Sequence, residues 1–378
     1  MLNEKYEKIL KARIQKGFML KLMWINVMRV NDVMFARGKL MNKIKILSEK
    51  DIGLLLNMNI AIDSVEKAYI QKNTNKASVW PLVFYEYEHN VFDLDIRSGN
   101  LDDSNAYGLK LISYNENNPK AGLNKVNATS LICDAKTGQP IALLNAAPIT
   151  SYRTGAAAGI GAKYLARKDS KNLLVVGCGN IATYSIVATL ITMPNIEKVV
   201  VCNPKNESSL LNKIDNIKAQ VTGLLQECGI ELKADIIPSN NLEESVRVSD
   251  IIITATPSEK AMIKSEWVKE GTHFSCMGAC MEGKQEIETE ILKNAKIFAD
   301  DTKQCIKAGE IQTAFRENII SKIDGEIGEV ILENKIGRDS EKDITIFDST
   351  GLFIQDLATS VELLKEANKR NIGMEVEV

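Results

Sequence analysis

Short apolar runs recur through the second half of the chain and predict buried parallel strands. Residues 173–176 are four apolar residues in succession, and the apolar run through Leu190 that follows them suits a helix. Segments with helical spacing separate the later apolar runs, which lie at residues 198–202, 234–238, 250–254, 272–275 and 296–299. This alternation predicts an α/β fold with a doubly wound, Rossmann-type parallel sheet.

The first half of the chain follows a different pattern, typical of an α+β domain. Residues 43–47 alternate like a short strand, and Ser48 with Asp51 forms an approximate capping box for the helix that follows. Another helix is predicted over residues 60–71, and residues 79–134 are rich in strand patterns.

Turn residues at 134–140 predict a hairpin between the strands 128–133 and 141–144. A helix of small residues is then expected over 150–165, where another backbone or a ligand can approach closely. A strand at 344–348 and a helix at 353–368 complete the chain.

The domain organisation that follows from these patterns is interrupted. We expect a Rossmann domain over residues 169–339. Residues 41–168 and 340–378 together are expected to form a discontinuous substrate-binding and dimerisation domain.

A glycine fingerprint follows the strand at 173–176 directly. Gly177 allows a tight turn, Gly179 leaves room for a pyrophosphate, and Ala182 lets the helix pack close to the strand. The helix N-terminus, with Asn180 and Ile181, offers free N–H groups to phosphates. The pattern predicts dinucleotide binding, and an ordinary glycine-tightened turn is the alternative.

The end of the next strand bears on the choice of cofactor. NAD-selective sites usually carry an acidic residue there, whereas this chain has Asn203 with Lys205 close behind it. We expect NADP(H), with NAD(H) as the alternative. Small and hydroxyl side chains after the strand at 250–254 suit the ribose and nicotinamide, and the cofactor-binding residues expected in this cleft are Thr254, Ala255, Thr256, Met277 and Gly278.

Composition narrows the class of protein. The chain has 378 residues, a net charge of −2 and 45% hydrophobic residues. It has no excess of basic residues that would indicate nucleic-acid binding. The seven cysteines form no even framework and read as reduced thiols of a cytoplasmic protein, and no metal site is expected. Residues 1–40 are rich in Lys and Arg, contain no span long enough for a membrane, and are interpreted as an extension before a native start at Met41.

Several separate motifs in one order resemble the ornithine cyclodeaminase/mu-crystallin family over residues 41–378. The motifs that carry the resemblance are residues 46–51, 108–110, 134–140, 150–156, the glycine fingerprint, 278–286, 325–328 and 347–351. The family includes ornithine cyclodeaminases, alanine dehydrogenases, imine reductases and mu-crystallin. The resemblance implies a homodimer with a Rossmann domain beside a substrate domain.

The resemblance also implies site residues. Lys110 and Arg153 match the family's lysine and arginine beside the nicotinamide, and Gly351 falls near the carboxamide. Arg153 can hold an α-carboxylate with its planar fork, and a desolvated Lys110 can exchange a proton with an amine or imine. A further family arginine has no clean counterpart, and Arg97 could supply that charge for substrate binding.

Cys280 departs from the family pattern. Ornithine cyclodeaminases resembling this chain carry an aspartate there, and a thiol is a weaker partner for a substrate ammonium. Cys280 either lines the pocket or handles a proton.

We therefore expect hydride transfer at the α-carbon of a small amino or imino acid, by an imine reductase or amino-acid dehydrogenase. Ornithine cyclodeamination to proline is the second possibility. A mu-crystallin-like binding protein is the third.

Overall fold

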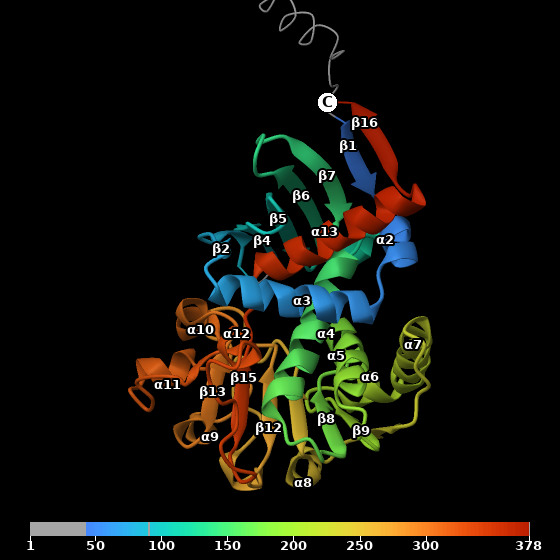
Figure 1. Cartoon of the computed structure of the whole chain (residues 1–378). Coiled ribbons are helices and arrows are strands. Elements are labelled where there is room, and N and C mark those ends of the chain that lie inside the picture. The colour runs from blue at the N-terminus through green and yellow to red at the C-terminus, as the bar shows by residue number, and fades with distance from the viewer. Residues whose placement is uncertain (1–42, 90, 378) are drawn as a thin grey trace, which may run out of the picture. The chain divides into compact units, whose positions relative to one another are not determined.

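The computed structural model describes residues 43–89 and 91–377, and Ile44–Glu375 form one compact unit. The expectations about residues 1–40 and about a start at Met41 lie outside the described residues. Within the described part, the strands gather into two sheets, and Figure 1 shows helices α3, α4 and α13 between them.

The second sheet in chain order is parallel throughout its described pairings. Its order is β10-β9-β8-β11-β12-β15-β13-β14, so the chain moves outward from β8 in one direction and then returns to add β11 on the other side. Ligands of such sheets bind at this reversal, beyond the carboxyl ends of the strands. Its strands are β8 (Asn172–Val176), β9 (Lys198–Cys202), β10 (Asp235–Ser239), β11 (Ile251–Thr254), β12 (His273–Cys276), β13 (Lys296–Ala299), β14 (Gly325–Glu326) and β15 (Thr345–Asp348).

The doubly wound parallel sheet is confirmed, with helices between its strands. These helical segments are α5 (Asn180–Thr192), α6 (Glu207–Leu211), α7 (Ile214–Glu227), α8 (Leu242–Val248), η2 (Ser265–Trp267), α9 (Thr289–Lys293), α10 (Thr302–Ala308), α11 (Gln312–Arg316) and α12 (Ile327–Ile331).

The expected return to the first domain near residue 340 needs correction. Strand β15 lies between β12 and β13, where His273 pairs with Thr345 and Phe298 with Phe347. Its residues are fully buried, as in an interior strand of a parallel sheet. The chain therefore leaves this sheet only after Asp348.

The first sheet is mixed, in the order β16-β1-β7-β6-β5-β4-β2, with β3 paired to β4. The predicted hairpin is confirmed, because β6 and β7 pair antiparallel with Ser130 opposite Leu144. The strands are β1 (Lys43–Leu47), β2 (Ala77–Val79), β3 (Val83–Glu88), β4 (Phe92–Leu101), β5 (Ala106–Asn115), β6 (Val126–Asp134), β7 (Pro140–Asn145) and β16 (Met374–Glu377), and the helices near them are α2 (Glu49–Leu55), α3 (Met58–Asn73), η1 (Asn118–Ala121), α4 (Ala146–Leu165) and α13 (Phe353–Arg370).

Side-chain caps set the helix starts. The predicted Ser48–Asp51 capping box is present. Helix α4 begins at Ala146 rather than near residue 150, because the Asn145 side chain accepts the N–H of Ala147 at 3.1 Å. Likewise α3 begins at Met58, since Asn57 accepts the N–H of Ile60 at 3.0 Å.

The small residues of α4 allow close packing of two helix backbones. A Cβ on Gly155 would lie 2.5 Å from the carbonyl carbon of Tyr184, and one on Gly159 would lie 2.8 Å from that of Ala188. Both neighbours belong to α5. The expected close approach is thus made by the helix that follows the glycine fingerprint.

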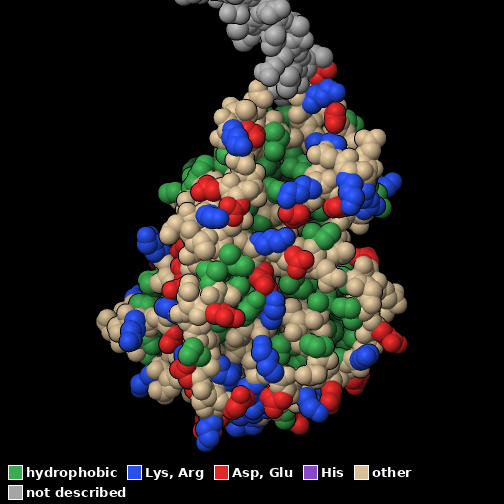
Figure 2. All heavy atoms as spheres, viewed as in Figure 1, with side chains coloured by type: hydrophobic (Ala, Val, Ile, Leu, Met, Phe, Trp, Pro, Cys, Tyr) green, Lys and Arg blue, Asp and Glu red, His purple; other side chains and the backbone are tan. Residues whose placement is uncertain are grey.

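The described surface mixes charges and carries no membrane span. Lysine and arginine side chains alternate with aspartate and glutamate over the face drawn in Figure 2. In residues 43–89 and 91–377 no helix is long and apolar enough to cross a bilayer.

Candidate active site

The glycine fingerprint opens a cavity at the reversal of the parallel sheet. Gly177 has a φ of 121°, and a Cβ there would lie 2.5 Å from the carbonyl oxygen of Ala255, so only glycine brings the loop after β8 against the loop after β11. Gly179 caps α5 without a side-chain hydrogen bond, and a Cβ there would meet nothing within 4 Å. The cavity therefore reaches the start of α5, where a helix N-terminus can bind a pyrophosphate.

The cavity has a volume of about 220 Å³ and collects residues from three loops. Its lining residues are Gly177, Cys178, Gly179, Asn203, Pro204, Lys205, Ser209, Lys213, Ala255, Thr256, Pro257 and Met262. Six of the predicted cofactor residues thus lie together.

The side of the cavity beyond β9 is polar and basic. Asn203 donates from Nδ2 to the carbonyl oxygen of Asn206 at 3.0 Å and to Cys178 Sγ at 3.2 Å. Lys205 and Lys213 add two cations, and Ser209 adds a hydroxyl. Ser209 and Lys213 were not predicted from the sequence, because they follow the strand end by several residues and no strand pattern marks them.

The remaining predicted cofactor residues lie outside the lining of this cavity. Asn180 begins α5 and is 3.4 Å from Ser151 Oγ, and Ile181 follows it. Thr254 is fully buried below the loop, as the last residue of β11. Met277 is buried and Gly278 half-buried after β12; a Cβ on Gly278 would lie 2.2 Å from the carbonyl oxygen of Thr256, so these two loops touch.

Three cations converge on one buried carboxylate beside this cleft. Lys110 Nζ lies 2.8 Å from Asp356 Oδ1, and Arg153 Nε lies 3.4 Å from Asp356 Oδ2. Arg97 stands directly opposite Lys110 in the pairing of β4 with β5. The first half of the chain and α13 thus bring together all three cations that the sequence analysis named.

Burial sets the protonation of this cluster. Lys110 is 1% exposed, and burial lowers its pKa to about 8, with Asp356 opposing this shift and Arg153 and Arg97 adding to it. Burial alone would raise the pKa of Asp356, but Lys110 and Arg153 hold it below its ordinary value. The cluster therefore pairs a permanently charged acceptor with a lysine that can release its proton near neutral pH.

Arg153 and Arg97 differ in how many of their donors are already used. Arg97 binds Asp95 through Nε and Nη2, and its Nη1 donates to the carbonyl oxygens of Thr350 at 3.1 Å and Gly351 at 2.8 Å. Arg153 donates from Nη1 to Gln355 Oε1 at 3.1 Å. A Cβ on Gly351 would lie 2.3 Å from Arg153 Nη1, so glycine there makes room for the guanidinium.

Cys280 lies within electrostatic range of this cluster. Burial opposes the charge of Arg97, but Asp95 and Cys280 raise its pKa above the ordinary value. Cys280 itself is half-buried and has a free thiol. The position that lacks the aspartate is thus beside the predicted substrate-binding cations.

Asp356 and Gln355 were missed by the sequence analysis. A signal was available, because Asp356 lies between Ile354 and Leu357 on a buried stretch of α13, where an unpaired charge is costly. Nothing in the sequence pattern names Lys110 as the partner of Asp356, since 246 residues separate them.

Known proteins are similar to this chain over most of its length. The model of the ornithine cyclodeaminase/mu-crystallin family matches residues 42–370. An alanine dehydrogenase of Archaeoglobus fulgidus is 37% identical over 88% of this chain and 98% of its own length.

Two solved structures are similar over nearly the whole described chain. An archaeal alanine dehydrogenase dimer with bound NAD has a TM-score of 0.77 and 36% identity, covering 89% of this chain and 99% of its own. The Δ1-pyrroline-2-carboxylate reductase of Thermococcus litoralis, in complex with NADH and L-proline, has a TM-score of 0.77 and 32% identity, covering 88% and 100%.

Proposed function

Because the chain belongs to the ornithine cyclodeaminase/mu-crystallin family, we propose that it is an NAD(P)-dependent oxidoreductase of small amino or imino acids. The observation that carries the proposal is the convergence of Arg97, Lys110 and Arg153 on Asp356, next to a cleft fitted for a dinucleotide. A bound nicotinamide cofactor would supply or accept the hydride.

The cations have distinct tasks in this proposal. Arg153 holds the α-carboxylate, because Gln355 orients its guanidinium through Nη1 and the planar fork can bind a carboxylate with its other donors. Lys110 gives a proton to the nitrogen during imine reduction, or takes one during amine oxidation. Arg97, anchored by Asp95 and two carbonyls, acts mainly through its charge on the carboxylate side.

The charge balance favours a substrate with one carboxylate and an uncharged side chain. Asp95 pairs with Arg97, and Asp356 pairs with Lys110 and Arg153, so the negative charge of each carboxylate is already balanced by cations of the protein. Cys280 offers a thiol where an ornithine cyclodeaminase would offer a carboxylate. Imine reduction or amino-acid dehydrogenation is therefore preferred, with ornithine cyclodeamination second and a purely binding role third.

NADP(H) is our preferred cofactor. The anion that would repel a 2′-phosphate is replaced by Asn203, and Lys205 and Lys213 line the same end of the cavity. The NAD and NADH bound by the two similar structures keep NAD(H) as the alternative.

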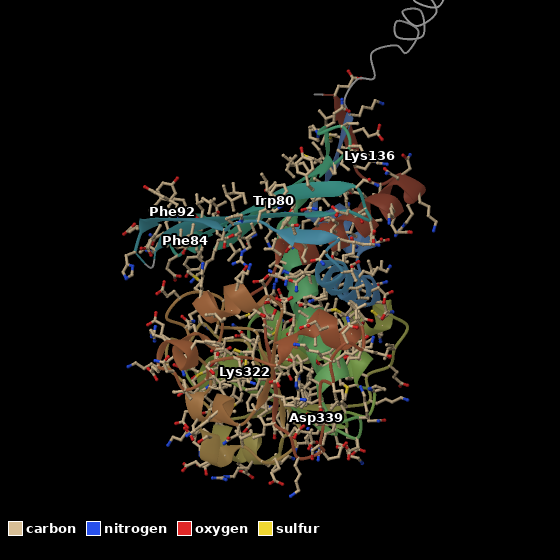
Figure 3. The ribbon with its side chains drawn as sticks, turned by 60° about the vertical axis from the view of Figure 1, so that its left-hand side comes forward. Trp80, Phe84, Phe92, Lys136, Lys322 and Asp339 are labelled. Atoms are coloured by element: carbon tan, nitrogen blue, oxygen red, sulfur yellow. The ribbon has the colours of Figure 1, made fainter. Side chains whose placement is uncertain are left out.

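We also propose a homodimer formed through the first sheet. Leu109, Leu131 and Leu143 align across β5, β6 and β7, and Leu109 and Leu143 are 36% and 37% exposed. Every residue of β3 is exposed, and Phe84 and Phe92 lie on the β3–β4 hairpin that projects beyond the helices in Figure 3. A second copy would cover this apolar area.

The two halves of the unit would divide the work. We propose that residues 41–168, with the chain from about residue 350 onward, bind substrate and pair the subunits. The intervening residues would bind the cofactor.

The absorbance of the reduced cofactor tests the proposal. Purified protein should consume NADPH or NADH with pyruvate and ammonia, or with Δ1-pyrroline-2-carboxylate. Conversion of ornithine to proline without net change in reduced cofactor would instead support the cyclodeaminase. Tight cofactor binding without turnover of any of these compounds would support the binding role.

A further inference from the structure

Glu286 joins the two loops that meet at the inner end of the cofactor cleft. It is fully buried, and its Oε1 accepts the N–H of Thr256 and the hydroxyl of Thr256, both at 2.7 Å. Its Oε2 accepts the N–H of Gly278 at 2.9 Å. One carboxylate therefore fixes the loop after β11 to the loop after β12.

The carboxylate is bound by amide and hydroxyl donors instead of by a cation, and its burial raises its pKa. Each oxygen receives a backbone N–H, which can only donate, so both oxygens must accept. A glutamine would turn its own NH₂ group toward one of these N–H groups and lose that contact. The geometry thus requires a carboxylate rather than any polar side chain of the same length.

Two further buried carboxylates, Glu310 and Asp348, hold the loop of Glu286 in place. Glu310 accepts the N–H groups of Glu286 at 2.9 Å and Ile287 at 2.8 Å. Asp348, at the end of β15, accepts the N–H groups of Glu310 and Ile311, both at 3.1 Å. The loop that carries Glu286 is thereby tied to the carboxyl end of β15, three residues before Gly351.

We propose that Glu286 is a positioning residue for the nicotinamide half of the cofactor, a role that rests on the proposed function. Thr256 lines the cofactor cavity, and Gly278 lies against Thr256 two residues before Cys280. Glu286 sets the separation of these two loops, and so the width of the slot between the phosphate-binding glycines and the cations around Asp356. Within the described residues, the side-chain hydrogen bonds of Glu286 go to Thr256 and Gly278, and none goes to Gly177, Gly179 or Asn203, so we expect the adenosine and pyrophosphate end to depend on it much less.

The test compares a complete cofactor with its nicotinamide-free counterpart. Binding of NADPH or NADH, whichever is tighter, is measured by calorimetry beside 2′-phospho-ADP-ribose or ADP-ribose. Glu286→Gln should weaken the complete cofactor by about tenfold, the loss expected for a hydrogen bond to a charged group, and leave the counterpart unchanged. Equal weakening of both ligands, or no weakening of either, would overturn the proposal.

Asp250→Asn is the control. Asp250 is also buried and also accepts two backbone N–H groups, those of Lys171 at 2.9 Å and Asn172 at 3.0 Å, although it is paired with Arg167 and Lys269 as well. It lies at the opposite, amino-terminal edge of the same sheet, directly before β11. This variant should keep the wild-type ratio of the two affinities.

Wild-type protein provides an independent measurement if Glu286→Gln does not fold. Hydrogen exchange at residues 276–287 should slow with the complete cofactor and not with the nicotinamide-free counterpart, and equal protection by both would refute the role. Failure of the wild-type protein to bind either ligand would instead refute the proposed function itself, and this inference with it.

Discussion

Lys110 and Asp356 form an ion pair closed off from solvent, with 2.8 Å between Nζ and Oδ1 and side-chain exposures of 1% and 0%. Because the lysine pKa lies at about 8, its proton is exchangeable in the range where enzymes work. The pair therefore joins a fixed negative charge to a movable proton.

The pH dependence of the two reaction directions should be opposite. Imine reduction needs protonated Lys110, so its kcat/KM should fall as pH rises through about 8, whereas amino-acid oxidation should rise through the same range. Lys110→Met should abolish the pH dependence of kcat/KM near pH about 8 in both reaction directions. Lys163→Met, which removes the lysine paired with Glu66, should preserve it. If Lys110→Met keeps this pH dependence in both directions, Lys110 does not transfer the proton.

The same pKa shift predicts a stability change. The folded protein releases the Lys110 proton at a lower pH than the unfolded chain, so its free energy of unfolding should rise between pH about 8 and the ordinary lysine value of 10.5. Urea unfolding across this pH range should show that the free energy of unfolding rises in the wild type and rises less in Lys110→Met.

Asp356→Asn should damage both stability and the proton position. Without its carboxylate the cluster keeps three cations, and breaking a buried pair in this way costs about 3–5 kcal/mol of unfolding free energy. The pKa of Lys110 should fall further, so the change in kcat/KM should occur at a lower pH. Thermal unfolding measures the first effect and a pH–rate profile the second. A kcat/KM profile that does not move along the pH axis would contradict an electrostatic effect of Asp356 on Lys110.

Cys280→Asp should admit a substrate ammonium. The new carboxylate would stand within range of Arg97 and offer the partner that ornithine lacks in the wild type. Ornithine-to-proline conversion is measured beside imine reduction, with Cys280→Ser as the control of matched size. If the aspartate variant gains no turnover of ornithine, Cys280 is not the branch point between the two activities.

Cofactor preference should move with the charges beyond β9. Lys213→Ala should weaken NADPH by about tenfold, the value of one hydrogen bond to a charged group, and leave NADH nearly unchanged. Asn203→Asp should shift preference further toward NADH. Lys198→Ala, at the other end of β9, is the control, and a similar loss of NADPH binding there would indicate only a general charge effect.

Subunit pairing should depend on the outer face of the first sheet. Leu109→Glu should place a charge in the aligned apolar row and yield monomers in analytical ultracentrifugation. Ile336→Glu changes an apolar residue that is 69% exposed but lies outside that sheet, so it should leave the dimer intact. A dimer that survives Leu109→Glu together with Tyr85→Glu would place the interface elsewhere.

Local patterns predicted the parallel sheet, and the family resemblance named Lys110 and Arg153, which the structure brings together around Asp356. The glycine fingerprint can be recognised from the sequence because the turn, the phosphate-binding position and the start of the helix are all determined by residues close together in the chain. The position of β15 was not predictable in this way, since a strand as short as Thr345–Asp348 fits either sheet until its hydrogen-bonding neighbours are known. Asp356 was not predicted for the same reason. Periodicity identifies the buried face of α13, but it does not identify which distant side chain contacts that face.

The contact between α4 and α5 has a consequence for how such a protein can change. Arg153 belongs to α4, the N-terminus of α5 faces the pyrophosphate space, and Gly155 and Gly159 let the two backbones touch. Under the proposed function, the arginine that would hold the substrate and the helix terminus that would bind the cofactor therefore belong to one closely packed pair of helices. Substitutions in the loop around Cys280 can change the substrate while the contact between α4 and α5 stays intact. Such substitutions need not disturb the relative position of substrate and cofactor that hydride transfer would require.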